Sequence, residues 1–323
     1  MGRMVDGRWM NDEALGAYRD GRFQRAETTL RSWITTDGSA GVTGVGGFAG
    51  ESGRYHLFVA LNCPWAHRTL LARLFNQLTE HISVSIASPS RTPDGWVFDS
   101  EGRFADSLLG ARALHGVYAE GADSYSGRVT VPVLWDKNMG VIVSNESSDI
   151  VRMFNSGFDG VAAPSSDFYP EGLRAEIEAV NERVYPSLNN GVYRAGFART
   201  QQAYDEGFDA VFETLDWLES RLENSRFVAG DAMTEADFRL FPTLARFDVA
   251  YHSTFKYNLR QLIDYPQLWD YARALYQRPG VAETVEFDIY RRGYHSKSAL
   301  RNPLGIIPRG PAIDWTVPST RFR

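Results

Sequence analysis

The sequence contains a single cysteine, Cys63, among 323 residues. One thiol excludes a disulfide within the chain, a zinc site built from several cysteines, and a dithiol pair that cycles within one molecule. Cys63 is therefore either a small buried side chain or a nucleophile that works alone.

Long apolar runs and an excess of positive charge are also missing. The longest apolar runs, such as residues 57–61, are far shorter than the ~20 residues of a membrane-spanning helix. The N-terminus lacks the apolar stretch of a signal peptide. The 34 basic and 40 acidic residues give a net charge of −6, which argues against nucleic acid or an anionic membrane as a partner. We expect a cytoplasmic protein whose thiol stays reduced.

Motifs for metals and nucleotides are absent as well. None of the six histidines has a partner at the spacing of zinc ligands on one helix. The glycine-rich stretch 38–53 precedes the first convincing strand, whereas a phosphate-binding loop follows one, so it is interpreted as a connector. The sequence predicts no metal site and no tightly bound cofactor.

Hydrophobic spacing predicts two domains with extensions. Strands are expected at 55–61, 82–86, 129–135 and 141–143, with helices starting at Pro64 and near 144–145 and an irregular insertion at 88–127. After a turn around Pro164, stripes at three-to-four-residue spacing predict helices to about residue 290. The predicted organisation is an arm and connector at 1–50, an α/β domain at 51–160, an all-α domain at 165–290 and a tail at 291–323.

Cys63 lies where the first strand meets its helix, directly before Pro64. Proline suits the first helical position, so the sulfur is expected beside the free amides of a helix N-terminus, where the helix dipole favours a thiolate. A redox pair would need a second cysteine three residues on, and Ala66 stands there. Any disulfide formed by Cys63 must therefore be made with, and resolved by, an external thiol.

Two further segments suit a thioredoxin-like domain. Val131-Pro132 precedes a predicted hairpin, and its proline indicates either an edge strand or a cis-proline beside an extended, peptide-like ligand. Glu146 and Ser147 lie at a predicted helix start. They are either an ordinary helix cap, or the groups that bind an α-amino group and a carboxylate, with help from helix amides.

With these features the sequence resembles the xi-class glutathione transferases, or glutathionyl-hydroquinone reductases, over most of its length. The likeness is carried by Gly53-Arg54-Tyr55-His56-Leu57, Cys63-Pro64-Trp65-Ala66-His67-Arg68, Asp94-Gly95-Trp96, Val131-Pro132-Val133-Leu134-Trp135-Asp136, residues 144–149, Arg292-Gly293-Tyr294 and Asn302-Pro303-Leu304-Gly305-Ile306-Ile307-Pro308.

The resemblance implies a thioredoxin-like N-terminal domain, an all-α C-terminal domain, a tail that returns to the active site, and a homodimer. It also implies the reaction: an S-glutathionyl hydroquinone and glutathione give the hydroquinone and glutathione disulfide, through a mixed disulfide on Cys63. Glutathione is then a co-substrate, and glutathionyl aromatic conjugates are the partners.

The resemblance also assigns site residues. Cys63 is the nucleophile, Tyr193 is the proton donor and acceptor, and Tyr251 and Tyr294 lower the pKa of the thiol. A hydrogen bond from a phenol to the thiolate is strong enough for this, because one such hydrogen bond lowers the pKa of the thiol by about one to two units. The implied glutathione-binding residues are Trp96, Arg128, Val129, Thr130, Val131, Glu146 and Ser147.

Three alternatives stay open on the sequence. The same cysteine could serve an omega-like thiol transferase or dehydroascorbate reductase. The same chemistry could use another low-molecular-weight thiol. A binding or scaffold protein on this fold is also conceivable, although a cysteine placed before Pro64 argues against it.

Overall fold

The computed structural model describes residues 2–11, 17–89, 91–162 and 166–321, which form two compact units. The first unit consists of Met1–Leu15 and Ala26–Asp167, and the second of Gly16–Arg25 and Phe168–Arg323. A short antiparallel hairpin within Gly16–Arg25 thus belongs to the second unit, although it precedes most of the first unit in the sequence. The boundary predicted around Pro164 lies outside the described residues.

A four-stranded sheet forms the centre of the first unit, in the order β13-β12-β7-β8. Strand β7 (Tyr55–Val59) is parallel to β8 (Ser83–Ile86) and antiparallel to β12 (Val133–Asp136), which pairs antiparallel with β13 (Val141–Ser144). This β-α-β then β-β-α arrangement confirms the predicted thioredoxin-like domain.

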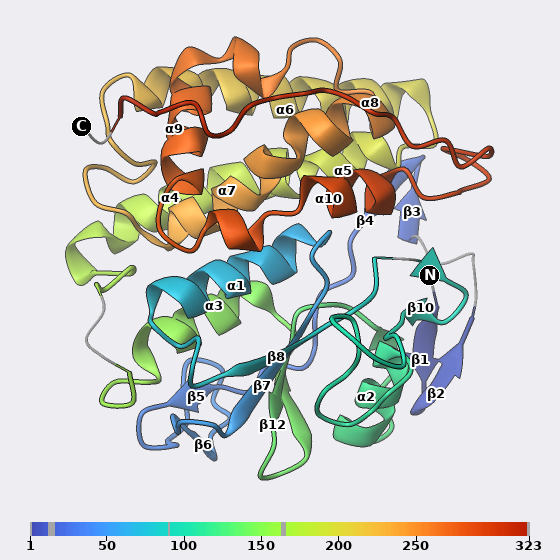
Figure 1. Cartoon of the computed structure of the whole chain (residues 1–323), viewed down its shortest axis with the longest axis vertical. Coiled ribbons are helices and arrows are strands. Elements are labelled where there is room, and N and C mark those ends of the chain that lie inside the picture. Colours follow the sequence, from blue (N-terminus) through green and yellow to red (C-terminus); the bar gives the residue numbers. More distant parts are fainter. Residues whose placement is uncertain (1, 12–16, 90, 163–165, 322–323) are drawn as a thin grey trace. The chain divides into compact units, whose positions relative to one another are not determined.

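Two helices follow the strands that carry the candidate residues. Helix α1 (Pro64–Phe75) connects the parallel pair of strands, and α3 (Ser147–Ser156) follows β13. The two helices pack against each other over the sheet, as Figure 1 shows. A third helix, α2 (Leu114–Gly121), lies in the predicted insertion and contacts β13. Short strands complete the unit: β1 (Arg3–Val5), β2 (Arg8–Met10), β5 (Ile34–Thr35), β6 (Phe48–Ala49), β9 (Arg91–Thr92), β10 (Gly95–Trp96) and β11 (Gly127–Arg128).

One imidazole interrupts the apolar core of this sheet. His56 is buried in β7, and its ring nitrogens contact the hydroxyls of Ser83 (2.7 Å) and Ser85 (2.9 Å). Ser85 in turn donates to Asp106 (3.0 Å), which ties the middle of the insertion to β8. Burial lowers the pKa of His56 to about 4, so the ring is neutral at pH 7.

Several boundaries differ by a few residues from those expected, and two of the differences have a clear local cause. The predicted strand 129–135 begins only at Val133, because Pro132 has no N–H to give to a sheet ladder. Helix α3 begins at Ser147 rather than near 144–145, because Ser144 still pairs with Leu134 in the sheet and Glu146 acts as the helix cap.

The second unit is helical apart from the hairpin. Its elements are β3 (Ala17–Arg19), β4 (Arg22–Gln24), η1 (Glu171–Leu173), α4 (Arg174–Val184), η2 (Tyr185–Asn189), α5 (Gly191–Gly196), α6 (Gln201–Leu222), α7 (Glu235–Arg246), η3 (Phe247–Tyr251), α8 (His252–Thr254), η4 (Leu262–Asp264), α9 (Pro266–Tyr276), η5 (Ala282–Thr284) and α10 (Phe287–Tyr294). The predicted stripe of α6 is buried against α5 and α9. A capping box starts α7, where the Thr234 amide donates to Asp237 (2.7 Å).

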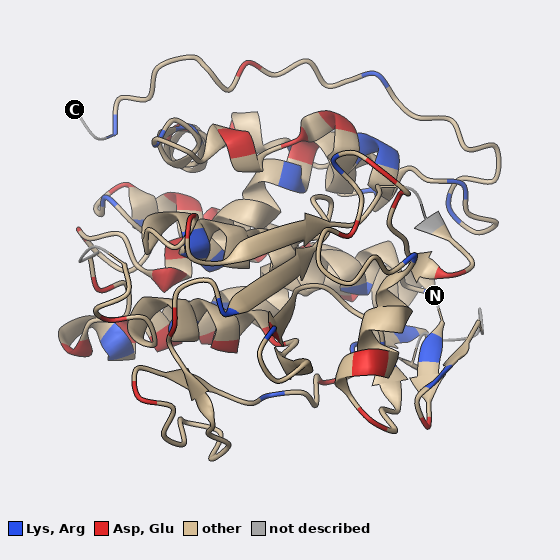
Figure 2. Cartoon of the chain, turned by 60° about the horizontal axis from the view of Figure 1, so that its bottom comes forward, with Lys and Arg blue, Asp and Glu red and all other residues tan. Residues whose placement is uncertain are grey.

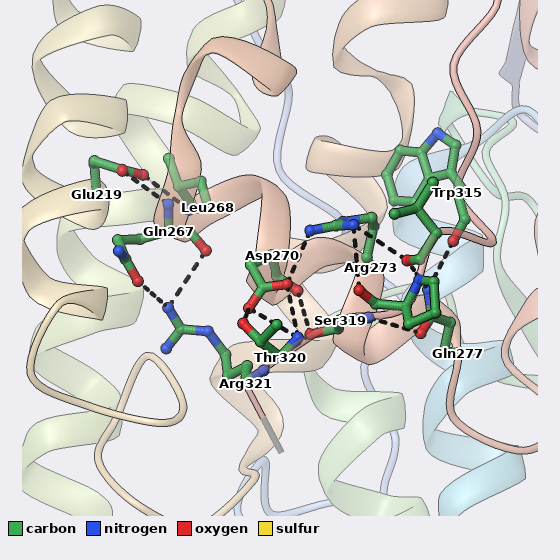
Figure 3. Close-up of polar contacts among 12 residues, drawn as sticks. Glu219, Gln267, Leu268, Asp270, Arg273, Gln277, Trp315, Ser319, Thr320 and Arg321 are labelled. Carbon is green, nitrogen blue, oxygen red and sulfur yellow. Dashed lines mark hydrogen bonds and ion pairs between the residues drawn. The ribbon is translucent and has the colours of Figure 1, made fainter. Parts of the chain in front are cut away.

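The end of the chain is fixed to α9 by side-chain hydrogen bonds (Figure 3). Gln277 donates to the carbonyl oxygens of Trp315 (2.9 Å) and Val317 (2.7 Å), and Asp270 accepts from the Thr320 hydroxyl (2.9 Å). The Trp315 ring meets Trp269 edge-on at 4.8 Å. The tail is therefore an integral part of the second unit.

Charged residues lie on helices and loops of both units, with the two signs interspersed, whereas the central strands are almost uncharged (Figure 2). None of the helices in the described part of the chain is both long enough and apolar enough to cross a membrane.

Candidate active site

Cys63 is the cap residue of α1, with extended backbone angles (φ −86°, ψ 120°) and Pro64 at the first helical position. This is the placement that the sequence predicts. The side chain is half-buried, and the Cys63 carbonyl accepts from the His67 amide (3.1 Å), which closes the first turn. The sulfur therefore sits at a helix N-terminus, where unpaired amides and the helix dipole stabilise a negative charge.

The segment before β12 lies against this sulfur. The Cys63 thiol donates to the Val131 carbonyl oxygen, with Sγ and O 3.5 Å apart, and the Val131–Pro132 peptide bond is cis. Of the two interpretations of Val131-Pro132, the structure therefore shows the cis-proline. It places the thiol next to the Val131 backbone, although 68 residues separate them in the sequence.

Glu146 and its neighbours form a polar cluster at the start of α3. The Glu146 carboxylate accepts from the Thr28 hydroxyl (2.7 Å) and from the amide (3.0 Å) and hydroxyl (2.9 Å) of Ser148. Burial alone would raise the pKa of Glu146, but these hydrogen bonds and the charge of Arg68 outweigh it and lower that pKa. The carboxylate is therefore ionised at neutral pH and suited to bind an ammonium group.

Two atoms beside this carboxylate have no hydrogen-bond partner within the described residues. They are the Ser147 hydroxyl and the Asn145 side-chain carbonyl, both on side chains less than 5% exposed (2% and 3%). Buried polar groups in folded proteins are normally paired, so an unpaired donor and acceptor at a helix N-terminus indicate a ligand site.

The other predicted glutathione contacts lie on separate short elements of the first unit. Trp96 is half-buried in β10, and Arg128 lies in β11, opposite Arg3 of β1. Val129 and Thr130 lead from β11 to Val131, and all three are in the connection before β12. Residues 128–131 are thus one continuous segment, and its last residue, Val131, contacts the Cys63 thiol.

Tyr118, which sequence reasoning missed, fixes that segment. Its buried hydroxyl donates to the Thr130 carbonyl (2.9 Å) and accepts from the Asn145 side-chain amide (3.0 Å). Burial raises the pKa of Tyr118 to about 12, so it stays a neutral donor. No local pattern in α2 marks this tyrosine, because its partners come from two other segments.

The three predicted tyrosines meet in the second unit. Tyr193 lies in α5, Tyr251 ends η3 and Tyr294 ends α10. The Tyr193 and Tyr294 hydroxyls are 2.6 Å apart, and Tyr251 lies 3.3 Å from Tyr294 and 3.5 Å from Tyr193. We call these three residues the tyrosine cluster.

Aromatic packing holds the rings of the tyrosine cluster. Phe255 stacks on Tyr251 at 5.6 Å and meets the edges of Tyr193 (5.6 Å) and Tyr294 (5.8 Å). A Cβ on Gly196 would come within 2.3 Å of the Phe255 ring, so glycine is required there. Burial, together with the neighbouring phenols, raises the pKa of Tyr251 well above its usual value. The Tyr251 hydroxyl therefore stays protonated at neutral pH, and the packing fixes the positions of all three rings.

Groups of three or more His, Cys, Asp or Glu side chains suited to a metal ion do not occur among residues 2–11, 17–89, 91–162 and 166–321. The candidate groups are therefore a thiol and a carboxylate in the first unit, Cys63 and Glu146, and the phenols of the tyrosine cluster in the second.

Comparison with known proteins identifies the fold and the family. The profile of the glutathione S-transferase N-terminal domain matches residues 62–156, and that of the C-terminal domain matches residues 201–274. The glutathionyl-hydroquinone reductase YqjG of Escherichia coli is 46% identical, with 99% of this chain and 98% of that protein aligned. The glutathionyl-hydroquinone reductase PcpF of Sphingobium chlorophenolicum is 45% identical, with 97% of each chain aligned.

Solved structures agree with the sequence matches. The glutathione-bound structure of YqjG from Escherichia coli superimposes with a TM-score of 0.90 at 44% identity, covering 98% of both chains. The xi-class enzyme of Natrialba magadii gives 0.89 at 41% identity, covering 99% of this chain and 96% of that one. The fold is that of the glutathione transferases, a thioredoxin-like domain followed by a helical one. Within that class, the chain belongs to the xi-class, glutathionyl-hydroquinone reductase family.

Proposed function

We propose that the protein is a glutathionyl-hydroquinone reductase in which Cys63 carries the glutathionyl group. The thiolate attacks the sulfur of an S-glutathionyl hydroquinone. The carbon–sulfur bond breaks, its electron pair stays on the ring carbon, and a proton completes the hydroquinone. A second glutathione then attacks the Cys63–glutathione disulfide and leaves as glutathione disulfide. The observation that carries the proposal is the placement of the only thiol at the start of α1, against the Val131 carbonyl.

Glutathione binding is assigned to the first unit. The ionised Glu146 would take the α-amino group of the γ-glutamyl end, and the unpaired Ser147 hydroxyl with the α3 amides would take its carboxylate. The Val131 backbone would pair with the cysteinyl residue of glutathione, and Trp96, Arg128, Val129 and Thr130 would line the remainder. The glutathione-bound structures of relatives from Escherichia coli and Saccharomyces cerevisiae support this ligand.

Proton transfer is assigned to the second unit. Tyr193 is proposed to protonate the departing ring carbon, and Tyr251 and Tyr294 to stabilise the Cys63 thiolate. The short Tyr193–Tyr294 hydroxyl contact supports the first role, because a phenol that accepts a hydrogen bond from its neighbour is stabilised when it loses its proton. A cytoplasmic homodimer completes the proposal.

Mass spectrometry of the intact protein tests the covalent step. After incubation with a glutathionyl hydroquinone, we expect one glutathione adduct on Cys63 and release of one hydroquinone, with no adduct on Cys63→Ser. Protein alkylated with iodoacetamide is a matched control, because Cys63 is its only thiol. Hydroquinone release without an adduct, or full turnover by Cys63→Ser, would refute the proposal.

The same assay separates the alternatives. An omega-like thiol transferase or dehydroascorbate reductase would turn over a glutathionylated disulfide or dehydroascorbate faster than the hydroquinone conjugate. A protein that uses another low-molecular-weight thiol would form the adduct from that thiol's conjugate and not from the glutathione conjugate.

A further inference from the structure

Arg246, at the end of α7, is a buried cation next to the tyrosine cluster. Its side chain is 0% exposed, and it directly precedes η3, the turn that ends at Tyr251. Its Nη1 donates to the Pro242 carbonyl (2.7 Å), and its guanidinium carbon lies 3.8 Å from the centre of the Tyr290 ring. Such a position holds the charge in a fixed place, away from water.

Phenols on several elements interact with this charge. Tyr290 and Tyr294 are on α10, which packs against η3, and all three members of the tyrosine cluster interact electrostatically with Arg246. These interactions outweigh the effect of burial and keep the pKa of Arg246 above its usual value, so it remains charged. In the opposite direction, the Arg246 charge lowers the pKa of Tyr251 and Tyr290, against the effect of their burial.

A fixed cation at this place has a direct consequence for proton transfer. When a phenol of the tyrosine cluster gives up its proton, a negative charge appears in a poorly solvated region. A positive group that is already oriented stabilises such a charge without reorganisation, and much more strongly than it would in water. Packing alone does not require the charge, since an apolar side chain of similar length could fill the same space.

We propose that Arg246 is an electrostatic positioning residue that stabilises the phenolate formed on the tyrosine cluster during hydroquinone release. The effect of Arg246 on catalysis rests on the proposed function, whereas its effect on the pKa values of the phenols does not. In the step concerned, the proton moves from the Tyr193 hydroxyl to the ring carbon that keeps the electron pair of the broken carbon–sulfur bond. Solvent then returns a proton to the phenolate.

A second cation near the tyrosine cluster has a different setting. The Arg25 guanidinium lies 5.0 Å from the centre of the Tyr193 ring, and its Nε donates to the Asn190 side chain (2.7 Å). Arg25 is only half-buried, so water screens its charge. We therefore expect Arg25→Met to change the phenols much less than Arg246→Met.

Titration of the phenols tests the proposal without substrate. The protein is labelled with [¹³Cζ]tyrosine, and resonances of the tyrosine cluster are assigned with Tyr193→Phe, Tyr251→Phe and Tyr294→Phe. Arg246→Met should raise the lowest phenol pKa of the tyrosine cluster by one unit or more, and Arg246→Lys should restore most of the difference. Arg183→Met is a matched control, because Arg183 lies over a different ring, that of Trp217, at 4.3 Å.

Kinetics provide the second readout. Arg246→Met should slow hydroquinone release at least tenfold, move the alkaline limb of its pH profile upward, and leave the KM for glutathione unchanged. Arg246→Gln, which keeps a donor for the Pro242 carbonyl, replaces Arg246→Met if the latter does not fold. Unchanged phenol pKa values, a lysine variant as impaired as the methionine variant, or unfolding of both uncharged variants would overturn the proposal. Absence of a Cys63 adduct in the wild type would instead refute the proposed function.

Discussion

The region around Cys63 and the tyrosine cluster are both proposed to stabilise a negative charge, and they differ in the groups that would do so. In the first unit the groups proposed for this are backbone amides at two helix starts, those of α1 and α3. In the second unit they are side-chain hydroxyls from three elements and a buried guanidinium.

The difference shows which part of each site tolerates substitution. Backbone amides at a helix start remain in place after any side-chain substitution that preserves the helix. Anion binding in the first region therefore depends on the fold, and ammonium binding depends on one carboxylate, Glu146. Hydroxyls and a guanidinium disappear with a single substitution. We therefore expect the second region to be the more sensitive to conservative changes, and three predictions test that comparison in order of decreasing effect.

The largest effect is expected from Tyr193→Phe. Loss of a general acid typically costs a factor of about 10² to 10⁴, and it should slow only the step in which the hydroquinone is released. Resolution of a preformed Cys63–glutathione disulfide by glutathione should stay at the wild-type rate. Rapid-quench measurements of the two half-reactions provide the comparison.

Tyr204→Phe serves as the control for Tyr193→Phe. This tyrosine also donates through its hydroxyl, to the Lys256 carbonyl at 2.7 Å, but lies outside the tyrosine cluster. Equal slowing of both half-reactions in Tyr193→Phe would contradict the division of labour between the units.

An intermediate effect is expected from Glu146→Gln. A hydrogen bond between charged groups contributes about 1.5–3 kcal/mol, so the affinity for glutathione should fall roughly ten- to a hundredfold. Thr28→Val should weaken binding by a smaller factor, because it removes one donor to the Glu146 carboxylate but leaves its charge. Isothermal titration calorimetry with glutathione measures both.

Glu120→Gln, an exposed position on α2, is the control for these variants. Because the pKa of Glu146 is lowered, wild-type affinity should be constant above the ordinary glutamate pKa and decline only as the pH falls below it. An unchanged affinity in Glu146→Gln would remove this residue from the binding site.

The smallest effect is an opposite response of the two units to acid. The pKa of His56 is lowered by burial to about 4, whereas the unfolded value is 6.5, so the stability it contributes is complete above pH 6.5 and is lost as the pH falls towards 4. The pKa of Asp248 is raised by burial to about 6 from 3.8, so its contribution is lost as the pH rises from 3.8 through 6.

From pH 7 to pH 5, His56 should cost about 2 kcal/mol of unfolding free energy, and Asp248 should return about 1 kcal/mol. Urea unfolding at both pH values should show a weaker acid destabilisation in His56→Gln and a stronger one in Asp248→Asn. The same pH dependence in both variants and the wild type would show that neither side chain controls it.

The first region was largely predictable because its determinants are local. Pro64 at the first helical position, Cys63 before it, and the polar residues before α3 are each visible in a few consecutive residues. The spacing of apolar residues also predicted the central strands and the α6 stripe. The strand boundary at Val133 and the start of α3 were misplaced by a few residues, because sheet pairing and capping decide them.

The second region could not be predicted in this way. Tyr193, Tyr251 and Tyr294 are among 15 tyrosines, and only the family resemblance selected them. Arg246 carried one signal that sequence reasoning overlooked: it interrupts the apolar run Leu244-Ala245-Arg246-Phe247, where a charged side chain must be buried. Its neighbours on α10 lie more than 40 residues along the chain, so no local pattern reveals what it faces.

By itself, the sequence determined the thioredoxin-like and helical halves, the monothiol chemistry and the location of Cys63 at a helix start, because residue spacing, proline and the count of thiols act over short distances. Only the tertiary structure decided that the Val131 carbonyl meets the sulfur, that the Ser147 hydroxyl is buried with no partner among the described residues, and that a buried cation lies over the Tyr290 ring on another helix. These contacts join segments far apart in the chain, and such contacts form only when packing brings those segments together.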